Sequence, residues 1–167
     1  MPPLSYDYDE CDATDLAALV RTKRASAKEL AEAAIARIER LDGQINAVPL
    51  RFFEQGLEAA RGSLPDGPFT GVPFLLKNLG ANARGTPLSN STRYLKDYVC
   101  DGDSTLVGRY REAGLIFLGR TNSSELGIEP FTEPALYGPT HNPWKLGHTA
   151  GGSSGGAGAA VAAGMLP

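Results

Sequence analysis

The sequence predicts an α/β fold in a single domain that covers residues 1–167. Two short apolar runs, at 72–79 and 115–119, are bounded by glycine and polar residues, as buried strands usually are. A capped helical segment at 103–113 separates them, and this strand–helix–strand order is typical of a parallel crossover unit. The 20 glycines and 12 prolines indicate many turns, which suits short elements of both kinds.

Bulk composition is that of a soluble globular protein. The chain has 167 residues, of which 42% are hydrophobic and 21% are charged. The formal net charge of −3 argues against nucleic acid as the main partner. No run approaches the ~18 consecutive apolar residues of a membrane span, and the N-terminus lacks the basic and apolar regions of a secretory signal. We therefore expect a cytoplasmic protein with no membrane partner.

The cysteines and histidines give no sign of a metal or cofactor site. Cys11 and Cys100 lie far apart and only 2 histidines occur, so a zinc site is not expected. His141 and His148 have no carboxylate at a spacing that suggests a charge-relay partner, and we interpret both as structural. We expect no metal, no cofactor and two reduced thiols.

The N-terminal part is expected to be a short arm followed by a helical scaffold. Residues 1–13 are acidic and aromatic and form the arm, and residues 14–62 form the scaffold. Thr14 is the predicted N-cap of the first helix, and a capping box at 26–29 starts a second helix that ends at Gly43. A third helical segment follows a short extended stretch. These elements carry no obvious chemistry.

A lysine interrupts the first predicted strand. Residues 72–79 follow a connector rich in Pro, Gly and Asp at 62–71, and Lys77 is the odd member of the apolar run. Its ammonium group either reaches solvent, as lysine side chains usually do, or is partly buried. Burial would lower its pKa and let it act as a base. The strand by itself favours the first interpretation.

Polar residues follow both predicted strands. Lys77 and Asn78 end the first strand, and the Arg-Thr-Asn sequence at 120–122 ends the second. Because the carboxyl ends of parallel strands meet at one edge of a sheet, where ligands usually bind, these side chains should lie close together. The stretch 81–100 is long for a connection and poor in apolar residues, which favours a role in lining the site. Residues 121–150 are polar and proline-rich, with room only for short helical turns.

A glycine-rich loop with two adjacent serines lies in the crossover unit, which we assign to residues 72–167. The loop, at 151–156, reads Gly-Gly-Ser-Ser-Gly-Gly and precedes an alanine-rich segment that favours helix. It could present a hydroxyl beside backbone N–H groups and a helix N-terminus. A phosphate-binding loop needs a lysine after the glycines, and none follows Gly147. Residues 151–155 also fit the Gly-x-Ser-x-Gly pattern of a nucleophile elbow, but that motif needs a strand directly before it and a histidine after it. A turn in which a serine caps the following helix is the competing interpretation.

Four segments of the chain together resemble the amidase signature family. Residues 71–78 are similar to the family's Gly-(Ile/Val)-Pro…Lys-(Asp/Asn) segment, and residues 119–125 to its Gly-(Lys/Arg)-Thr-Asn-x-x-Glu segment. Residues 137–144 and 151–156 are similar to its Gly-x-Thr-x-Asn-Pro-Trp and Gly-Gly-Ser-Ser-Gly-Gly segments. The order and spacing of these segments agree with those of the family from Thr14 onward. Residues 72–77, 132–134 and 142–147 are most similar to the branch of 6-aminohexanoate cyclic dimer hydrolase-like amidases.

The resemblance implies amide hydrolysis by a Ser–cis-Ser–Lys triad on a mixed sheet flanked by helices. Lys77 matches the family's catalytic lysine, and Ser153 its bridging serine, whose peptide bond to Gly152 would be cis. Neutral Lys77 would accept a proton from Ser153, which takes one from the nucleophile and later protonates the leaving amine. Gly127 and Ile128 match a loop that lines the acyl site. The resemblance implies a small-molecule amide as substrate and is compatible with a homo-oligomer.

The family's nucleophilic serine is not among the residues given. In the family it lies in an Asp-x-Gly-Gly-Ser segment well after the bridging serine, at a position beyond Pro167. We therefore expect the N-terminal portion of an amidase, with an incomplete sheet and no activity alone, which needs the missing C-terminal portion. The alternative is a non-catalytic stand-alone domain that acts by binding or association. The first is favoured because Lys77 and Ser153 are both retained.

Overall fold

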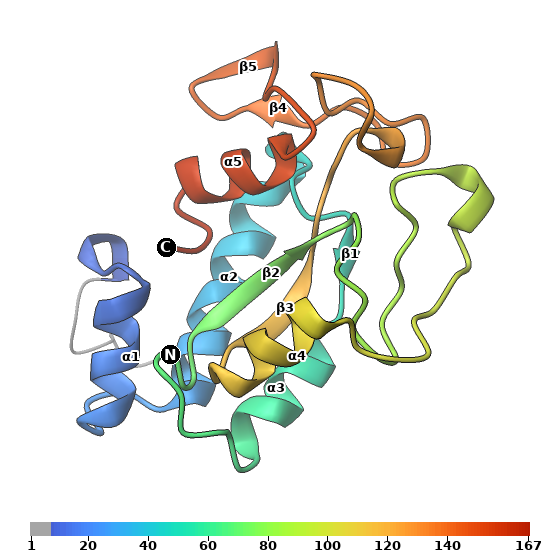
Figure 1. The fold of residues 1–167 in the computed structure, drawn as a ribbon. Helices are drawn as coiled ribbons and strands as arrows, with labels where there is room; N and C mark the ends of the chain where they lie inside the picture. Colours follow the sequence, from blue (N-terminus) through green and yellow to red (C-terminus); the bar gives the residue numbers. More distant parts are fainter. Residues whose placement is uncertain (1–7) are drawn as a thin grey trace.

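A mixed three-stranded sheet between helices organises the fold (Figure 1). The computed structural model describes residues 8–167. The helices are α1 (Ala13–Arg21), α2 (Ala27–Ile45), α3 (Phe53–Arg61), α4 (Thr105–Glu112) and α5 (Gly155–Ala162). The strands are β1 (Leu50–Arg51), β2 (Pro73–Lys77), β3 (Ile116–Thr121), β4 (His141–Asn142) and β5 (Lys145–Thr149). Short 3-10 helices span Tyr8–Glu10, Arg93–Leu95 and Glu125–Gly127.

The predicted crossover unit is confirmed. β2 and β3 pair in parallel and are connected through α4, while β1 adds to the other side of β3 in the antiparallel direction. In this register Lys77, the last residue of β2, lies opposite Thr121, the last residue of β3. The fold is therefore α/β with a mixed sheet, and the polar residues that follow the two strands share one edge.

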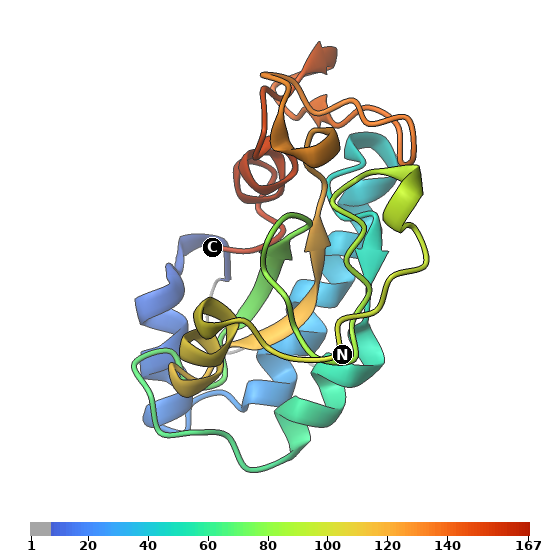
Figure 2. The ribbon, with the colours of Figure 1, turned by 45° about the vertical axis from the view of Figure 1, so that its right-hand side comes forward.

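The side chains of β2 and β3 alternate between two apolar cores. Leu75 and Leu118 contribute to the larger core, which also contains residues of α2, α3 and α5. Leu76 and Phe117 point to the other face and pack with Val107 of α4. Figure 2 shows α4 on one face of the sheet and α2 and α3 on the other. This two-sided burial explains why both strands read as continuous apolar runs.

The predicted N-cap of the first helix is wrong by two residues. Asp12, not Thr14, caps α1: its carboxylate accepts the backbone N–H groups of Thr14 at 2.7 Å and Asp15 at 2.9 Å. Residues 1–7 of the predicted arm lie outside the described residues. Tyr8 is 5% exposed and packs against α1 and α2, with the guanidinium of Arg37 over its ring.

The capping box that starts α2 is confirmed, but its predicted end is not. Ser26 and Glu29 exchange hydrogen bonds between side chain and backbone as expected. The helix passes Gly43 and ends two residues later, where Asn46 adopts a left-handed conformation with φ 56°. Gly43 does not break the helix because a single glycine costs only about 1 kcal/mol in a helix interior.

A buried carboxylate stabilises the connection between α2 and β1, and it was not identified from the sequence. Asp42 is 4% exposed and accepts the backbone N–H groups of Ala47 at 2.6 Å and Val48 at 3.1 Å. The guanidinium of Arg51 donates to the same carboxylate at 2.7 Å. These contacts fix the chain that leads into the antiparallel strand.

The hairpin of β4 and β5 was not predicted. Sequence reasoning allowed only short turns after residue 121, and the 3-10 helix Glu125–Gly127 fits that expectation. All five residues of β5 are exposed. The hairpin therefore lacks the alternation of apolar and polar residues by which strands are recognised.

Two further expectations concern membrane-spanning helices and metal sites. No helix among residues 8–167 is long and apolar enough to cross a bilayer. Over the same described range, no group of three or more His, Cys, Asp or Glu residues is arranged to hold a metal ion.

Candidate active site

Lys77 and Ser153 come into direct contact at the carboxyl edge of the sheet. Lys77 Nζ donates hydrogen bonds to Ser153 Oγ at 2.7 Å and to Ser154 Oγ at 2.9 Å. The lysine side chain is half-buried, and desolvation lowers the pKa of its amine. Among residues 8–167 no carboxylate forms an ion pair with Lys77. No ion pair among the described residues therefore opposes the effect of desolvation on this amine.

The Gly-Ser loop makes a close backbone approach to the segment that precedes the hairpin. The peptide bond between Gly152 and Ser153 is cis, as the resemblance implied. A side chain at Gly152 would overlap the backbone of Glu129 and Phe131, with its Cβ 2.7 Å from Glu129 O. Glycine is therefore required at this position by space, and the loop is fixed against its neighbour.

Thr132 anchors both ends of the loop. Its hydroxyl donates to the carbonyl of Gly151 at 2.8 Å and accepts the backbone N–H of Gly155 at 3.1 Å. Thr132 is fully buried, and its own carbonyl accepts the N–H of Thr140 at 2.8 Å. The side chain of Thr132 thus spans the two serines, and its backbone carbonyl ties this segment to Thr140, the residue before β4.

The start of α5 packs directly onto the end of β3. A Cβ at Gly156 would overlap the backbone of Asn122, and the two residues are joined by a hydrogen bond of 3.1 Å from Gly156 N to Asn122 O. The side chain of Asn122 donates to the hydroxyl of Thr140 at 3.1 Å and to the carbonyl of Gly138 at 3.2 Å. The helix that directly follows the two serines is therefore placed by the end of the strand next to Lys77.

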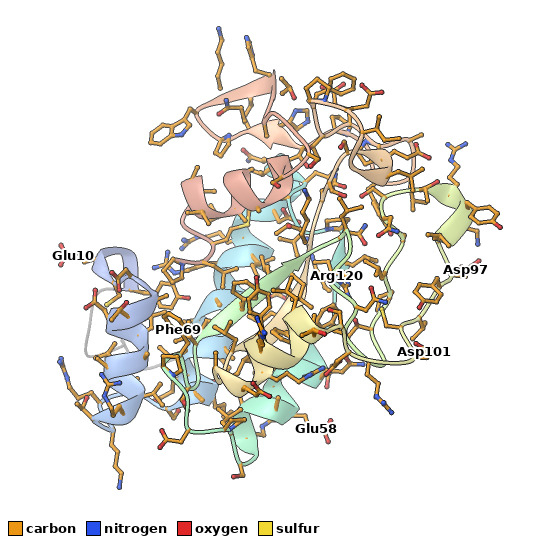
Figure 3. The ribbon with its side chains drawn as sticks, in the orientation of Figure 1. Glu10, Glu58, Phe69, Asp97, Asp101 and Arg120 are labelled. Carbon is orange, nitrogen blue, oxygen red and sulfur yellow. The ribbon has the colours of Figure 1, made fainter. Side chains whose placement is uncertain are left out.

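A fully buried arginine holds the long loop at 81–100 against the sheet. Figure 3 marks Arg120 near the carboxyl ends of β2 and β3. Its guanidinium donates to the carbonyls of Pro87 at 2.6 Å, Ala81 at 2.8 Å and Lys77 at 3.2 Å, and to Thr86 Oγ1 at 3.0 Å. Burial lowers the pKa of this guanidinium, and the nearby Cys100 acts in the opposite direction.

A second buried network follows Lys77 in the chain. Asn78 is fully buried and donates to Ser89 Oγ at 2.9 Å and Ser91 Oγ at 3.2 Å. The hydroxyl of Ser91 lies 3.0 Å from that of Ser123, and Ser123 donates back to the carbonyl of Asn78 at 3.3 Å. The end of β2 is thus fixed on the side opposite to the Gly-Ser loop.

The structure brings Lys77 and Ser153 together but leaves Gly127 and Ile128 outside this contact. Among the described residues no hydrogen bond joins either of the latter to Lys77 or Ser153. Gly127 packs near Leu79, and Ile128 is 75% exposed. Ile128 lines a cavity of about 300 Å³ whose wall includes Glu129 and Phe131, the residues that touch Gly152.

The anchoring roles of three residues near the site were not predicted from the sequence, for one reason. Thr132, Asn122 and Arg120 each act through contacts with residues distant in the chain. No local spacing marks such contacts. Only the unusual placement of polar residues directly after an apolar strand pointed to this region.

The fold and these contacts define an α/β protein with a lysine–serine site at the carboxyl edge of its sheet. The chain belongs to the Amidase family, whose sequence model matches residues 29–167. This confirms the resemblance seen in the motifs.

The relatives found by comparison agree with this assignment. The chain is 45% identical over 158 residues to a 6-aminohexanoate-cyclic-dimer hydrolase of Paenarthrobacter ureafaciens, covering 93% of this chain and 32% of the relative. It is 45% identical over 162 residues to an acylamidase of Rhodococcus erythropolis, covering 93% and 34%. The solved structure of 6-aminohexanoate cyclic dimer hydrolase superposes with a TM-score of 0.91 at 44% identity, over 98% of this chain and 34% of that one. The chain spans about a third of the length of these relatives.

Proposed function

We propose that this chain supplies the lysine and the bridging serine of a Ser–cis-Ser–Lys amide hydrolase, and that turnover requires sequence beyond residue 167. The contact of 2.7 Å between Lys77 Nζ and Ser153 Oγ carries the proposal. It is a direct path for a proton between a desolvated amine and a hydroxyl. The family membership and the coverage of about a third of the relatives support it.

In the proposed reaction Lys77 is the base and Ser153 the relay. When the amine is neutral, the Ser153 hydroxyl donates to Nζ along the same contact and accepts the proton of the attacking serine hydroxyl. The oxygen of the attacking serine forms a bond to the amide carbon. Ser153 then protonates the leaving amine as the C–N bond breaks. Water then attacks the resulting ester: Ser153, with Lys77 as base, takes a proton from the water and returns one to the serine oxygen as the ester C–O bond breaks.

The proposed substrate is a small-molecule amide, and no cofactor takes part in these steps. The proposed partner is the C-terminal portion of the enzyme, in the same chain or in a second one. Two cysteines far apart in the sequence suit a reducing compartment, so we place the protein in the cytoplasm.

Hydrolysis of a simple aryl amide tests this proposal. We expect no release of p-nitroaniline from acetyl-p-nitroanilide by the 167-residue chain, because the attacking serine is absent from it. The protein expressed from the complete reading frame should release it. Turnover by the isolated chain that a Ser153→Ala change abolishes would overturn the requirement for further sequence. A reading frame that stops after codon 167 would instead favour the stand-alone binding domain.

The rate should depend on the protonation of Lys77. Only the neutral amine accepts a proton, so kcat/KM should rise with pH through the Lys77 pKa. Desolvation lowers that pKa, so the plateau should begin at a lower pH than the ordinary lysine value of 10.5 implies. A pH profile of kcat/KM for the complete protein measures this. A rate that falls with rising pH, or rises only above 10.5, contradicts a neutral lysine base.

A further inference from the structure

The hydroxyl of Ser153 is placed by the residues on either side of it in the loop. Ser153 is half-buried, and its neighbours Gly152 and Ser154 are exposed. Among residues 8–167, its hydrogen bond with Lys77 is the only one that Ser153 makes. Lys77 itself is held in β2 by pairing with β3. The distance between the amine and the hydroxyl therefore depends on what holds the rest of the loop.

One hydroxyl group holds the loop on both sides of Ser153. Thr132 Oγ1 donates to the carbonyl of Gly151 at 2.8 Å and accepts the backbone N–H of Gly155 at 3.1 Å. Gly151 lies two positions before Ser153, and Gly155 lies two positions after it. A Cβ at Gly155 would overlap the Thr132 hydroxyl, so glycine is what lets the loop come this close.

Thr132 is in turn tied to the sheet edge that carries Lys77. It is fully buried, and its carbonyl accepts the N–H of Thr140 at 2.8 Å. The hydroxyl of Thr140 accepts a hydrogen bond from the side chain of Asn122 at 3.1 Å and donates to the carbonyl of Asn46 at 2.7 Å. Asn122 directly follows β3, the strand that pairs with β2. The loop and the lysine thus share one rigid frame.

The position of Thr132 requires a group that donates and accepts at once. A hydroxyl does both, whereas an aliphatic side chain of the same shape does neither. Without the hydroxyl, the carbonyl of Gly151 and the N–H of Gly155 lose this partner together. Buried backbone groups without partners are unfavourable, so the loop would shift to find new ones. Ser153 lies between the two groups and would move with them.

We propose that Thr132 is a positioning residue, whose hydroxyl keeps Ser153 Oγ within hydrogen-bond distance of Lys77 Nζ. The inference rests on the proposed function, in which a proton passes along this contact. Thr132 does not touch the reacting atoms and acts through Ser153. A displacement of about 1 Å in a catalytic group can lower a rate by about 10²-fold. Because the hydroxyl is turned toward the loop backbone, the loss should fall on kcat and not on KM.

Two substitutions of Thr132 separate the hydroxyl from the methyl group. Thr132→Val keeps the shape and removes the hydroxyl, while Thr132→Ser keeps the hydroxyl and removes the methyl group. In the product of the complete reading frame, Thr132→Val should lower kcat for acetyl-p-nitroanilide by about 10–10²-fold and change KM by less than about twofold. Thr132→Ser should stay within about threefold of the wild type. If Thr132→Val does not fold, Thr132→Cys takes its place, since a thiol hydrogen-bonds only weakly.

Thr70→Val is the matched control. The hydroxyl of Thr70 makes the same two kinds of bond: it donates to the carbonyl of Pro65 at 2.8 Å and accepts the N–H of Gly67 at 2.9 Å. Thr70 lies in the connector before β2, at the opposite end of the molecule from α5 (Figures 1 and 2). The control variant loses a comparable pair of hydrogen bonds and should keep its kcat.

A double variant tests whether Thr132 acts through Ser153. When Ser153 is already alanine, there is no relay hydroxyl left to position. Thr132→Val added to Ser153→Ala should therefore slow the residual reaction by no more than about twofold. A purely structural loss would appear in both backgrounds.

Crystal structures of the complete-protein variants give a measurement that needs no turnover. We expect Lys77 Nζ and Ser153 Oγ to lie more than about 3.5 Å apart in Thr132→Val, beyond hydrogen-bond distance, and to remain hydrogen-bonded in Thr132→Ser.

The outcomes separate this inference from the proposed function. The positioning role is overturned if Thr132→Val is as active as Thr132→Ser, if Thr70→Val loses as much kcat, or if the contact of 2.7 Å persists in Thr132→Val. A further large loss in the Ser153→Ala background overturns it as well. A lengthened contact without anilide hydrolysis by the complete wild-type protein overturns the proposed function and leaves the positioning of Ser153 standing. Wild-type hydrolysis that Thr132→Val leaves unchanged has the opposite meaning.

Discussion

Replacing Ser153 with alanine should reduce kcat/KM for anilide hydrolysis by the complete protein by about 10²–10⁴-fold, the usual contribution of general acid–base catalysis. The substitution removes the only side chain that joins Lys77 to a nucleophile in the proposed relay. Lys77→Met should cause a loss of the same size, because it keeps the length of the side chain and removes the proton acceptor. Initial rates with acetyl-p-nitroanilide over a range of concentrations measure both variants.

The double variant sharpens this prediction. Two groups that act in one proton relay are strongly non-additive, so Lys77→Met with Ser153→Ala should be about as slow as either single variant. Ser63→Ala and Lys28→Met are the controls, since Ser63 is exposed in a connector and Lys28 pairs with Glu32 on the surface of α2. Full activity of Ser153→Ala, or losses that simply multiply in the double variant, would contradict the relay.

Arg120→Met should lower the free energy of unfolding by about 3–5 kcal/mol, because it leaves several buried acceptors without a donor. These acceptors include the carbonyls of Pro87, Ala81 and Lys77. Arg120→Lys should recover only part of the loss, since one ammonium group cannot reach acceptors that a planar guanidinium reaches in several directions. Urea denaturation followed by circular dichroism measures the change.

The control for Arg120 is an arginine on the surface of the neighbouring helix. Arg109 is exposed on α4, and Arg109→Met should change the free energy of unfolding by no more than about 0.5 kcal/mol. If Arg120→Met were as mild as this control, the guanidinium would not be what holds the 81–100 loop. A lower anilide rate in Arg120→Lys would further show that the loop supports the position of Lys77.

The strands and helices could be predicted where burial leaves a pattern in the chain. β2 and β3 are covered on both faces, so each reads as an apolar run between polar residues. The Ser26–Glu29 box marked the start of α2 because capping is a local interaction. The exposed strand β5 and the cap of α1 at Asp12 could not be found in the same way. The first has no apolar pattern, and two acceptable caps compete near the second.

The candidate site was predictable in its main members and not in its supports. Lys77 and Ser153 were identified by their place in the motifs and by the convergence of two strand ends. Arg120 and Asn122 were expected at this edge of the sheet, but their anchoring contacts and those of Thr132 were not predicted, since each contacts backbone far away in the sequence. The open choice between a capping turn and a nucleophile elbow at 151–156 was a choice between local interpretations, and the contact with Lys77 is not local.

The sequence by itself determined the α/β class, the crossover unit and the family, because these depend on periodicity, capping and motif order. The tertiary structure alone decided that a lysine 76 positions before Ser153 lies 2.7 Å from its hydroxyl. It also decided that this lysine is half-buried, with a lowered pKa, and not extended into solvent. The reason is physical: desolvation and hydrogen bonding depend on which atoms surround the amine, and the fold brings two of those atoms, the hydroxyl oxygens of Ser153 and Ser154, from the Gly-Ser loop.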